Sequence, residues 1–344
     1  MTNILRTNQA VEMLATGDIL ELGQAANAVR QKMHPGNVVT FVIDRNINYT
    51  NICTSECRFC AFYLKIGADG SYTLSQDSIF EKLKETIAAG GTQVMLQGGL
   101  NPALGLKYYI NLLRFIKKNF TIVVHSFSPA EVLHIAKQEG LSVTEVLKSL
   151  KEAGLDSLPG GGAEILVDEV RRRVSPKKIS AGDWLAVMEA AHRVGLETTA
   201  TMVIGMGETD AQRMEHMEKV RQLQEKTGGF RAFIIWSYQP GNTEMGGQKI
   251  SAWEYLKTLS VARLYFHNIK HIQGSWVTQG QNIGQLTLAF GANDLGSIML
   301  EENVVKAAGT AYQMSIEKML NLIRETGFQP AQRDTQYNVI KTFE

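Results

Sequence analysis

Short apolar runs rich in β-branched residues alternate with longer helical patterns along almost the whole chain. Such runs predict buried strands, and apolar residues at every third or fourth position predict amphipathic helices. Strands are predicted at residues 38–44, 93–97, 121–125, 154–157, 197–204, 231–237 and 270–274, with a weaker one near 298–300. Helices are predicted at residues 77–89, 104–119, 129–139, 143–153, 179–194, 210–226, 252–267 and 313–325.

Alternating strands and helices of this length indicate a parallel sheet with helices outside it. Eight such units favour an α/β fold of the closed (βα)8 TIM barrel type, and an open doubly wound sheet is the alternative. No low-complexity linker divides the chain. We therefore expect an N-terminal helical extension, residues 1–36, followed by a single barrel domain, residues 37–344, with helices at its C-terminus.

Composition narrows the class of protein. The 344 residues include 35 Lys and Arg against 34 Asp and Glu, which is a formal charge of +1. This balance gives no electrostatic footprint for nucleic acid or an anionic membrane. No apolar run reaches the ~18 residues that span a bilayer, and the N-terminus lacks the apolar core of a secretory signal. We expect a cytoplasmic protein that binds neither nucleic acid nor membrane.

All three cysteines, Cys53, Cys57 and Cys60, lie within eight positions after the first predicted strand. An odd, clustered trio does not form a disulfide framework. Ferredoxin-type clusters and structural zinc sites use four protein ligands, so an iron–sulfur cubane held by three thiolates keeps one iron open for another ligand. The alternatives are three reduced thiols without a metal, or a non-catalytic zinc module completed by a histidine such as His125.

Other unusual residues also follow predicted strands. They are Gln-Gly-Gly at 97–99, His-Ser at 125–126, Pro-Gly-Gly-Gly at 159–162, Gly-Met-Gly-Glu at 205–208 and Gln-Pro-Gly at 239–241. In a barrel the carboxyl ends of all strands share one face, and this face carries the chemistry. The coincidence of these segments with strand ends supports the barrel.

The spacing C-x3-C-x-aromatic-C after the first strand of such a barrel resembles the radical S-adenosylmethionine (radical SAM) superfamily. In that superfamily three thiolates hold a 4Fe-4S cluster whose open iron binds SAM, and the reduced cluster cleaves SAM to a 5′-deoxyadenosyl radical. The resemblance implies that Cys53, Cys57 and Cys60 are the iron ligands. It also implies a small-molecule substrate and an electron donor such as flavodoxin or ferredoxin.

The same resemblance implies contacts to SAM near the cysteines. Gly98 and Gly99 match the diglycine after the second strand that bonds the methionine amino group. Phe59 takes the aromatic position beside the adenine. Taken alone, the diglycine would predict an ordinary turn; its place after a strand favours the cofactor role.

Two further segments carry expected SAM contacts. Gly205 and Glu208 match the adenine-contacting segment after the fifth strand, in which Thr201 stands where the superfamily has a glycine. Glu164 follows the fourth strand, where a polar residue commonly bonds the ribose of SAM. Capping of the next helix is the alternative role for Glu164.

The resemblance extends from residue 48 to residue 309. Segments 48–53, 60–63, 125–131 and 158–164 are similar to a subgroup with aminofutalosine synthase, cyclic dehypoxanthinyl futalosine synthase and the components of deazaflavin FO synthase. Segments 236–243, 273–280 and 290–297 most resemble the futalosine cyclase family. The implied oxidoreductase reaction, in menaquinone biosynthesis, abstracts hydrogen from C4′ of dehypoxanthine futalosine. The carbon radical adds to the benzoate ring, and one electron and one proton then leave.

Three polar residues in these segments are candidates for substrate contacts. His125, His271 and Asp294 can each bond ribose hydroxyls or accept a proton, and we expect them to share one pocket above the cofactor. Structural roles for all three are the alternative. An arginine fork, or the amides of residues 159–162, would suit the benzoate carboxylate. The basic residues at 171–173 and 177–178 lie at a helix end, which favours a solvated cluster over a nucleic-acid patch.

Overall fold

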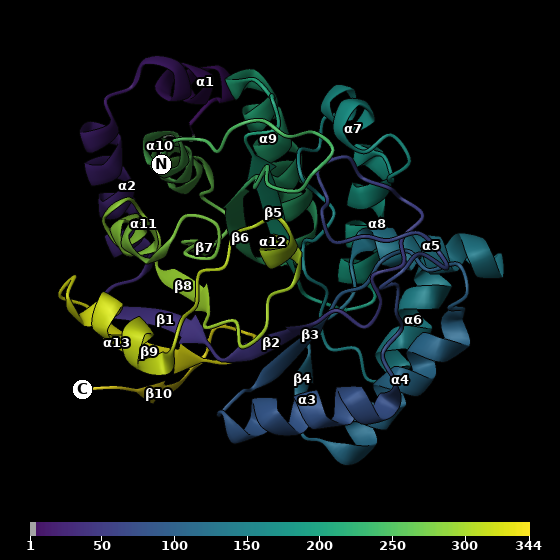
Figure 1. The fold of residues 1–344 in the computed structure, drawn as a ribbon. Helices are drawn as coiled ribbons and strands as arrows, with labels where there is room; N and C mark the ends of the chain where they lie inside the picture. Colours follow the sequence, from purple (N-terminus) through teal and green to yellow (C-terminus); the bar gives the residue numbers. More distant parts are fainter. Residues whose placement is uncertain (1–4) are drawn as a thin grey trace.

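The computed structural model describes residues 5–344, and its strands form a central group surrounded by helices (Figure 1). The strands are β1 (Val38–Val42), β2 (Asp44–Ile47), β3 (Gln93–Leu96), β4 (Val123–Val124), β5 (Thr198–Ile204), β6 (Phe230–Ser237), β7 (His271–Gln273), β8 (Asp294–Ser297), β9 (Gln329–Arg333) and β10 (Val339–Thr342). All neighbouring strands pair in parallel except β9 and β10, which pair antiparallel.

Parallel pairing closes the strands into a ring. β5, β6, β7 and β8 pair in chain order, and β8 pairs with β1. β1 is followed at once by β2, which pairs with β3, and β3 pairs with β4. Between β4 and β5, two bridges of the described chain continue the ring, from His125 to Ser157 and from Leu158 to Thr198. The predicted (βα)8 barrel is confirmed.

Two of the eight strands differ from their predictions. The fourth, predicted at residues 154–157, is reduced to the bridges at Ser157 and Leu158. The eighth, predicted near 298–300, begins at Asp294, where Asp, Gly and Ser are residues that strands normally disfavour. The predicted segment continues the ladder, because the N–H of Leu300 donates to the carbonyl of Asp44.

Thirteen α-helices lie in the described residues. They are α1 (Thr7–Thr16), α2 (Ile19–Met33), α3 (Gln76–Ala88), α4 (Leu106–Asn119), α5 (Pro129–Glu139), α6 (Val143–Ala153), α7 (Asp168–Val174), α8 (Ala181–Arg193), α9 (Asp210–Thr227), α10 (Ala252–Tyr265), α11 (Gln281–Leu286), α12 (Val304–Ala307) and α13 (Ile316–Arg324). All eight predicted helices are present. The short helices α7, α11 and α12 were not predicted.

The N-terminal helices cover one wall of the barrel. α1 packs on α9 and α2 packs on α10, as Figure 1 shows in purple and green. The Thr7 hydroxyl lies 2.8 Å from the hydroxyl of Tyr265 on α10 and joins the two elements. α2 begins at an N-cap, Asp18, whose carboxylate accepts from the N–H groups of Leu20 and Glu21.

A strand hairpin ends the chain where the sequence predicted only helices. β9 pairs in parallel with β1, and β10 pairs with β9. β9 holds a proline at position 330, which argues against a strand when the sequence is read alone. Its last residue, Arg333, is buried and reaches Asp294 of β8, with Nε 2.5 Å from Oδ2. The hairpin therefore contributes a charged residue to the barrel interior.

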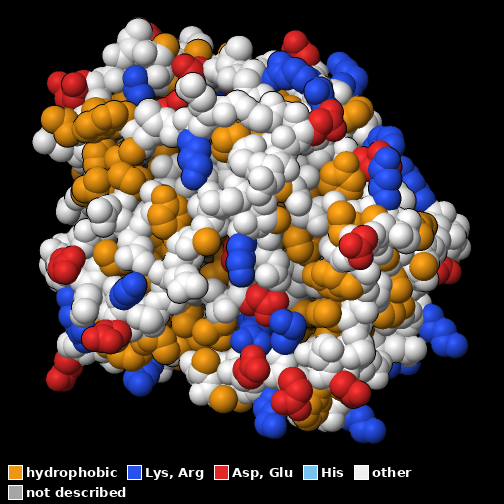
Figure 2. Space-filling view, viewed as in Figure 1, with side chains coloured by type: hydrophobic (Ala, Val, Ile, Leu, Met, Phe, Trp, Pro, Cys, Tyr) orange, Lys and Arg blue, Asp and Glu red, His pale blue; other side chains and the backbone are white. Residues whose placement is uncertain are grey.

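The surface carries charges of both signs. On the face of Figure 1, acidic and basic side chains are interspersed, with a basic group near α7, whose last turn holds three arginines (Figure 2). Across residues 5–344, no helix is long and apolar enough to cross a membrane.

Candidate active site

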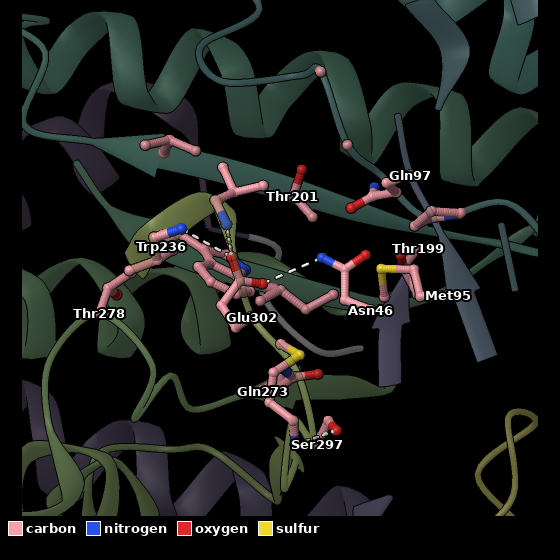
Figure 3. A pocket seen from close by; sticks show the side chains of 18 of the residues that line it. Asn46, Met95, Gln97, Thr199, Thr201, Trp236, Gln273, Thr278, Ser297 and Glu302 are labelled. Atoms are coloured by element: carbon pink, nitrogen blue, oxygen red, sulfur yellow. Dashed lines mark hydrogen bonds between the residues drawn. The ribbon is translucent and has the colours of Figure 1, made fainter. Parts of the chain in front are cut away.

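A cavity of about 320 Å³ lies inside the barrel and extends to the loops that follow the strands. Alternate residues of several strands face it, as the two-residue period of a strand requires; on β3 these are Gln93 and Met95, and Gln97 follows directly after the strand. Figure 3 shows Trp236 and Thr278 on one side of the cavity and Met95 and Gln97 on the other. The barrel interior is therefore a binding site rather than a filled core.

The three cysteines lie on the loop after β2, and Cys60 lines the cavity. Burial is the main cause that raises the pKa of Cys57 to about 12; Glu164, Cys60 and Cys53 act in the same direction, and the Lys178 ammonium opposes them. Burial likewise raises the pKa of Cys60. Buried thiols such as Cys57 and Cys60 need a cationic centre to become thiolates, and a metal cluster provides one.

The zinc alternative needs a fourth ligand beside the three cysteines. Nowhere in residues 5–344 are three or more His, Cys, Asp or Glu side chains arranged around one ion. His125 bonds to Ser157 inside the barrel, with Nδ1 2.6 Å from Oγ, and does not complete a zinc site. A cubane takes one thiolate at each of three irons, so the trio fits a cluster better than the zinc alternative.

Gly98 and Gly99 lie directly against the cysteine loop. A Cβ on Gly98 would come within 2.8 Å of three ring carbons of Tyr49. A Cβ on Gly99 would lie 2.2 Å from the Ile52 carbonyl oxygen and 2.7 Å from the Cys53 Cβ. Glycine is thus required at both positions because the Tyr49 ring approaches one and the backbone of the cysteine loop approaches the other, a reason that the sequence did not reveal.

Glu131 supports this turn and was not predicted as a site residue. It lies in the first turn of α5, and its Oε1 accepts from the Tyr49 hydroxyl at 2.6 Å and from the Gly98 N–H at 3.1 Å. The carboxyl is buried, and burial raises the pKa of Glu131 to about 7, although these hydrogen bonds act in the opposite direction. Its signal in the sequence was only its place after a strand-end segment.

Glu164 lines the cavity beside the cysteine loop. Lys178 Nζ lies 2.8 Å from Oε1, and Arg171 lies 3.5 Å from Oε2, which is buried without a hydrogen-bond partner in the described part of the chain. The Lys178 ammonium also lies 5.5 Å from the centre of the Phe59 ring. Because α7 begins only at Asp168, Glu164 does not cap that helix.

The basic cluster predicted as solvated is therefore partly buried. The Arg171 guanidinium donates to the backbone carbonyls of Gly162 and Ala163, and it is only 3 % exposed. Lys178 is paired with Glu164. The prediction was wrong for these two residues because Arg171 donates to carbonyls of the glycine-rich loop and Lys178 pairs with a carboxylate from another loop, contacts that only the tertiary structure creates. Arg172 and Arg173 are exposed as expected.

Gly205 and Glu208 do not line the cavity. Both oxygens of Glu208 accept from the backbone of its own loop, at 2.8 Å from the N–H groups of Gly205 and Met206. Arg213 of α9 donates to the same carboxylate at 2.8 Å. Gly205 has φ +97°, a conformation that favours glycine. The structure gives Glu208 a loop-fixing role through its side chain.

His125, His271 and Asp294 do not share one pocket. His125 lines the cavity. His271 begins β7 at the opposite, amino end of the barrel, where it stacks on Tyr337 with ring centres 3.9 Å apart. Asp294 begins β8 and is fully buried. The sequence similarity of their segments led us to expect that the three residues lie close together. His271 and Asp294 are the first residues of their strands, however, and in a barrel that end lies away from the cofactor face.

Two arginines complete the cavity lining and were not predicted from the sequence. Arg231 of β6 and Arg333 of β9 both line the cavity near its amino end. Asp294 pairs with Arg333, so this carboxylate acts on the cavity through the arginine. Burial, assisted by the positive charges of Arg231 and Arg333, holds the pKa of His125 well below its usual range and keeps the imidazole neutral.

Family models match both halves of the chain. The model of the radical SAM superfamily matches residues 47–220, which hold the cysteine loop, the diglycine and Glu164. The chain belongs to the radical SAM superfamily. A second model, the CofH/MqnC C-terminal region, matches residues 227–344 and includes both arginines of the cavity. The predicted superfamily is confirmed.

Close relatives of this radical SAM chain align over nearly its full length. A protein of Halalkalibacterium halodurans named cyclic dehypoxanthine futalosine synthase is 50 % identical over 342 residues, which cover 99 % of this chain and 92 % of that protein. A protein of Streptomyces coelicolor with the same name is 44 % identical over 96 % of this chain and 84 % of its own. A protein of Archaeoglobus fulgidus named 5-amino-6-(D-ribitylamino)uracil--L-tyrosine 4-hydroxyphenyl transferase is 39 % identical, over 95 % and 97 % respectively.

A solved structure shares the fold. The crystal structure of methylornithine synthase superposes with a TM-score of 0.76 at 21 % identity and covers 96 % of this chain and 95 % of its own. Members of the radical SAM superfamily bind a 4Fe-4S cluster and SAM. The three buried or half-buried thiols, the close glycine turn and the unpartnered oxygen of Glu164 fit these two groups.

Proposed function

We propose that this radical SAM protein cyclises dehypoxanthine futalosine to cyclic dehypoxanthinyl futalosine in menaquinone biosynthesis. The observation that carries the proposal is a single deep cavity that has the cluster thiol Cys60 at its carboxyl end and buried polar groups at its amino end. The two relatives named as synthases of this product, at 50 % and 44 % identity, support the choice of substrate.

We propose that Cys53, Cys57 and Cys60 ligate the 4Fe-4S cluster, with SAM on the open iron. When bound, the reduced cluster and SAM supply the 5′-deoxyadenosyl radical that removes a hydrogen atom from substrate. Glu164 Oε2 can accept a hydrogen bond from a SAM hydroxyl, while Lys178 fixes its other oxygen. Phe59 lines the same end of the cavity and offers a ring face to the adenine.

The glycines and Glu208 act through the backbone in this proposal. Gly98 and Gly99 hold their turn against the cysteine loop and can present carbonyl oxygens to the methionine end of SAM. Gly205 lets its loop reverse direction. Glu208 fixes that loop, with Arg213 as its counter-charge.

The substrate chemistry requires a closed cavity. Loss of the C4′ hydrogen allows a new bond from C4′ to a carbon of the benzoate ring, and one electron and one proton must leave to restore aromaticity. The barrel walls exclude water and hold the reacting carbons together. Because the pKa of His125 is held low, we assign its neutral imidazole to a hydrogen bond with the substrate rather than to proton uptake.

His271 and Asp294 receive positioning roles. Asp294 holds Arg333 at the cavity wall, with Oδ2 also accepting from the Thr40 hydroxyl at 2.6 Å. His271 holds the opposite end of the barrel through Asn293, 3.0 Å from its Nδ1. Neither side chain lines the cavity, so we assign neither a contact with substrate.

We also propose that flavodoxin or ferredoxin supplies the electron. Arg58 and Lys177 lie on and beside the cysteine loop with side chains 44 % and 58 % exposed. Their present partners, Glu244 and Glu56, are surface carboxylates that an acidic redox protein could replace. The division into a helical extension, residues 1–36, and a single barrel domain, residues 37–344, stays part of the proposal. Stimulation of turnover by a purified flavodoxin at low but not at high salt would support this donor.

An anaerobic assay tests the function. The reconstituted protein, SAM and a chemical reductant are incubated with dehypoxanthine futalosine, and products are identified by mass spectrometry. We expect the cyclic product together with 5′-deoxyadenosine, and neither in a Cys60→Ser variant. A parallel reaction with the enolpyruvyl benzoate used by aminofutalosine synthase tests the sister activity. Conversion of that compound alone would overturn the proposed substrate.

A further inference from the structure

Arg231 is a buried cation without a full counter-charge. Its side chain is only 10 % exposed and lines the cavity. One of its terminal nitrogens donates to the Ser157 hydroxyl. Glu197 lies 3.9 Å from the other and is itself 54 % exposed, so it neutralises the guanidinium weakly. Nε is buried with no hydrogen-bond partner anywhere in residues 5–344.

Apart from Glu197, no acidic side chain in residues 5–344 forms an ion pair with Arg231; Asp334 and Tyr337 favour its charged form from a distance, and Arg333 opposes it. Arg333 lines the same cavity, but it has its own partner, because two of its nitrogens bond the two oxygens of Asp294. Asp44 also lines the cavity, but its carboxylate already accepts from Gln93 and Ser297. Burial lowers the pKa of Arg231, which is the expected result of incomplete neutralisation. An unpaired buried charge is costly, and an anionic ligand would remove that cost.

We propose that Arg231 binds the benzoate carboxylate of the substrate at the amino end of the barrel cavity. The assignment rests on the proposed function, which gives the substrate one carboxylate. A guanidinium edge and a carboxylate form two parallel hydrogen bonds, and the free Nε lies on such an edge. Nη2, the other nitrogen of this edge, donates one of its two hydrogens to Ser157, which also bonds His125, and keeps the second for the carboxylate. The Arg231 guanidinium is thus held in one orientation before the substrate binds.

This contact orients the substrate. With its carboxylate at Arg231, the rigid benzoate ring points along the cavity and places the sugar toward Cys60 and Glu164, which line the other end. The hydrogen atom to be removed then faces the cofactor end. His125 lies beside the aromatic part of the substrate and Trp236 forms a wall of the same cavity (Figure 3). A substrate in the reverse orientation would place its carboxylate beside Glu164, where the Lys178 ammonium is already paired.

Equilibrium binding to the anaerobically reconstituted protein with SAM tests the contact. Isothermal titration calorimetry is carried out with dehypoxanthine futalosine and with the matched pair 3-acetylbenzoate and 3-acetylbenzamide, which differ in charge. We compare the wild type, Arg231→Gln, Arg231→Lys and the control Arg221→Gln. Arg221 is a matched control because its side chain is 11 % exposed, its Nε also lacks a partner, and Glu218 neutralises it outside the cavity.

The expected result is selective loss of carboxylate binding. Arg231→Gln should bind dehypoxanthine futalosine and 3-acetylbenzoate roughly 30-fold or more weakly, since removing one partner of a buried charge pair has effects of this size. Affinity for 3-acetylbenzamide should change less than about threefold. Arg231→Lys, which keeps the charge without the fork, should fall between the two. Arg221→Gln should match the wild type, with circular dichroism showing that all variants fold.

Two outcomes separate the inference from the function. If the wild type forms the cyclic product but Arg231→Gln binds 3-acetylbenzoate as tightly as the wild type, the carboxylate contact is overturned and the function stands. If Arg231→Gln fails to fold, Arg231→Lys provides the test. A bidentate contact is excluded if Arg231→Lys binds 3-acetylbenzoate as tightly as the wild type and keeps the wild-type preference for it over 3-acetylbenzamide. If the wild type binds the benzoate through Arg231 but forms no cyclic product, the proposed function fails and the anion site stands.

Discussion

Gly99→Ala is expected to prevent assembly of the iron–sulfur cluster. The new Cβ would lie 2.7 Å from the Cβ of Cys53 and 2.2 Å from the carbonyl oxygen of Ile52. Carbon atoms pack at about 3.5 Å or more, so the cysteine loop must move by roughly 0.8 Å. Overpacking of this kind destabilises a native conformation by about 1–3 kcal/mol, which corresponds to a ~5- to 150-fold loss in population of the native loop.

Anaerobic reconstitution followed by iron and sulfide analysis measures the effect. Gly182→Ala is the matched control, because a Cβ there meets nothing closer than the Ser180 hydroxyl at 3.8 Å. Both variants should keep the circular dichroism of a folded barrel. Only Gly99→Ala should lose most of its iron and visible absorption. Wild-type cluster content in Gly99→Ala, with SAM binding alone lost, would refute this reasoning and assign the glycine to the cofactor.

Three further changes test other parts of the site. Cys57→Ser should abolish SAM cleavage while thermal unfolding stays close to wild type, because a serine oxygen does not replace a thiolate on the cluster; deoxyadenosine at the wild-type rate would contradict the assignment. Burial raises the pKa of Glu131 from 4.5 to about 7, so the native state holds a proton that the unfolded chain loses in this range. The free energy of unfolding should fall by roughly 3 kcal/mol as pH rises from about 4.5 to 7. Urea titrations at pH 5 and 8 should show a smaller change for Glu131→Gln than for the wild type; an equal change in both proteins would exclude Glu131 as its source. His271→Ala should leave the ratio of deoxyadenosine to cyclic product unchanged, since the ring lies outside the cavity; a raised ratio would place it on the substrate.

The fold was largely predictable because its pattern is local. Strand and helix periodicities identified the eight units of the barrel, and strand ends identified the loops that carry Cys60 and Glu164. β9 was missed because Gln329–Arg333 contains a proline and polar residues. Its pairing with β1 depends on a partner almost 300 residues away, which no local pattern reveals.

The site was predictable only at its carboxyl end. Cysteine spacing and glycine turns are sequence motifs, whereas Arg231 is a single basic residue in an apolar strand and Arg333 ends a polar segment that was not predicted as a strand. Their presence in the interior depends on distant partners, such as Asp294 for Arg333. Lys178 was read as solvated for the same reason, because its partner Glu164 lies on another loop. Burial of a charged residue can be predicted only when its counter-ion is known, and the tertiary structure determines which counter-ion lies beside it.

The pairing of β1 with β8 and β9 also sets the order in which the barrel can be assembled during synthesis. At a translation rate of about 5–20 residues per second, Val38–Val42 waits roughly 15–60 s for the segment ending at Arg333. Until β8 and then β9 emerge, β1 lacks its two partners, and its sequence Val-Val-Thr-Phe-Val has a composition prone to intermolecular strand pairing. Nascent chains should therefore depend on a holding chaperone that covers this edge. A chain truncated before residue 329 would keep the edge exposed and aggregate even when its cysteine loop is intact.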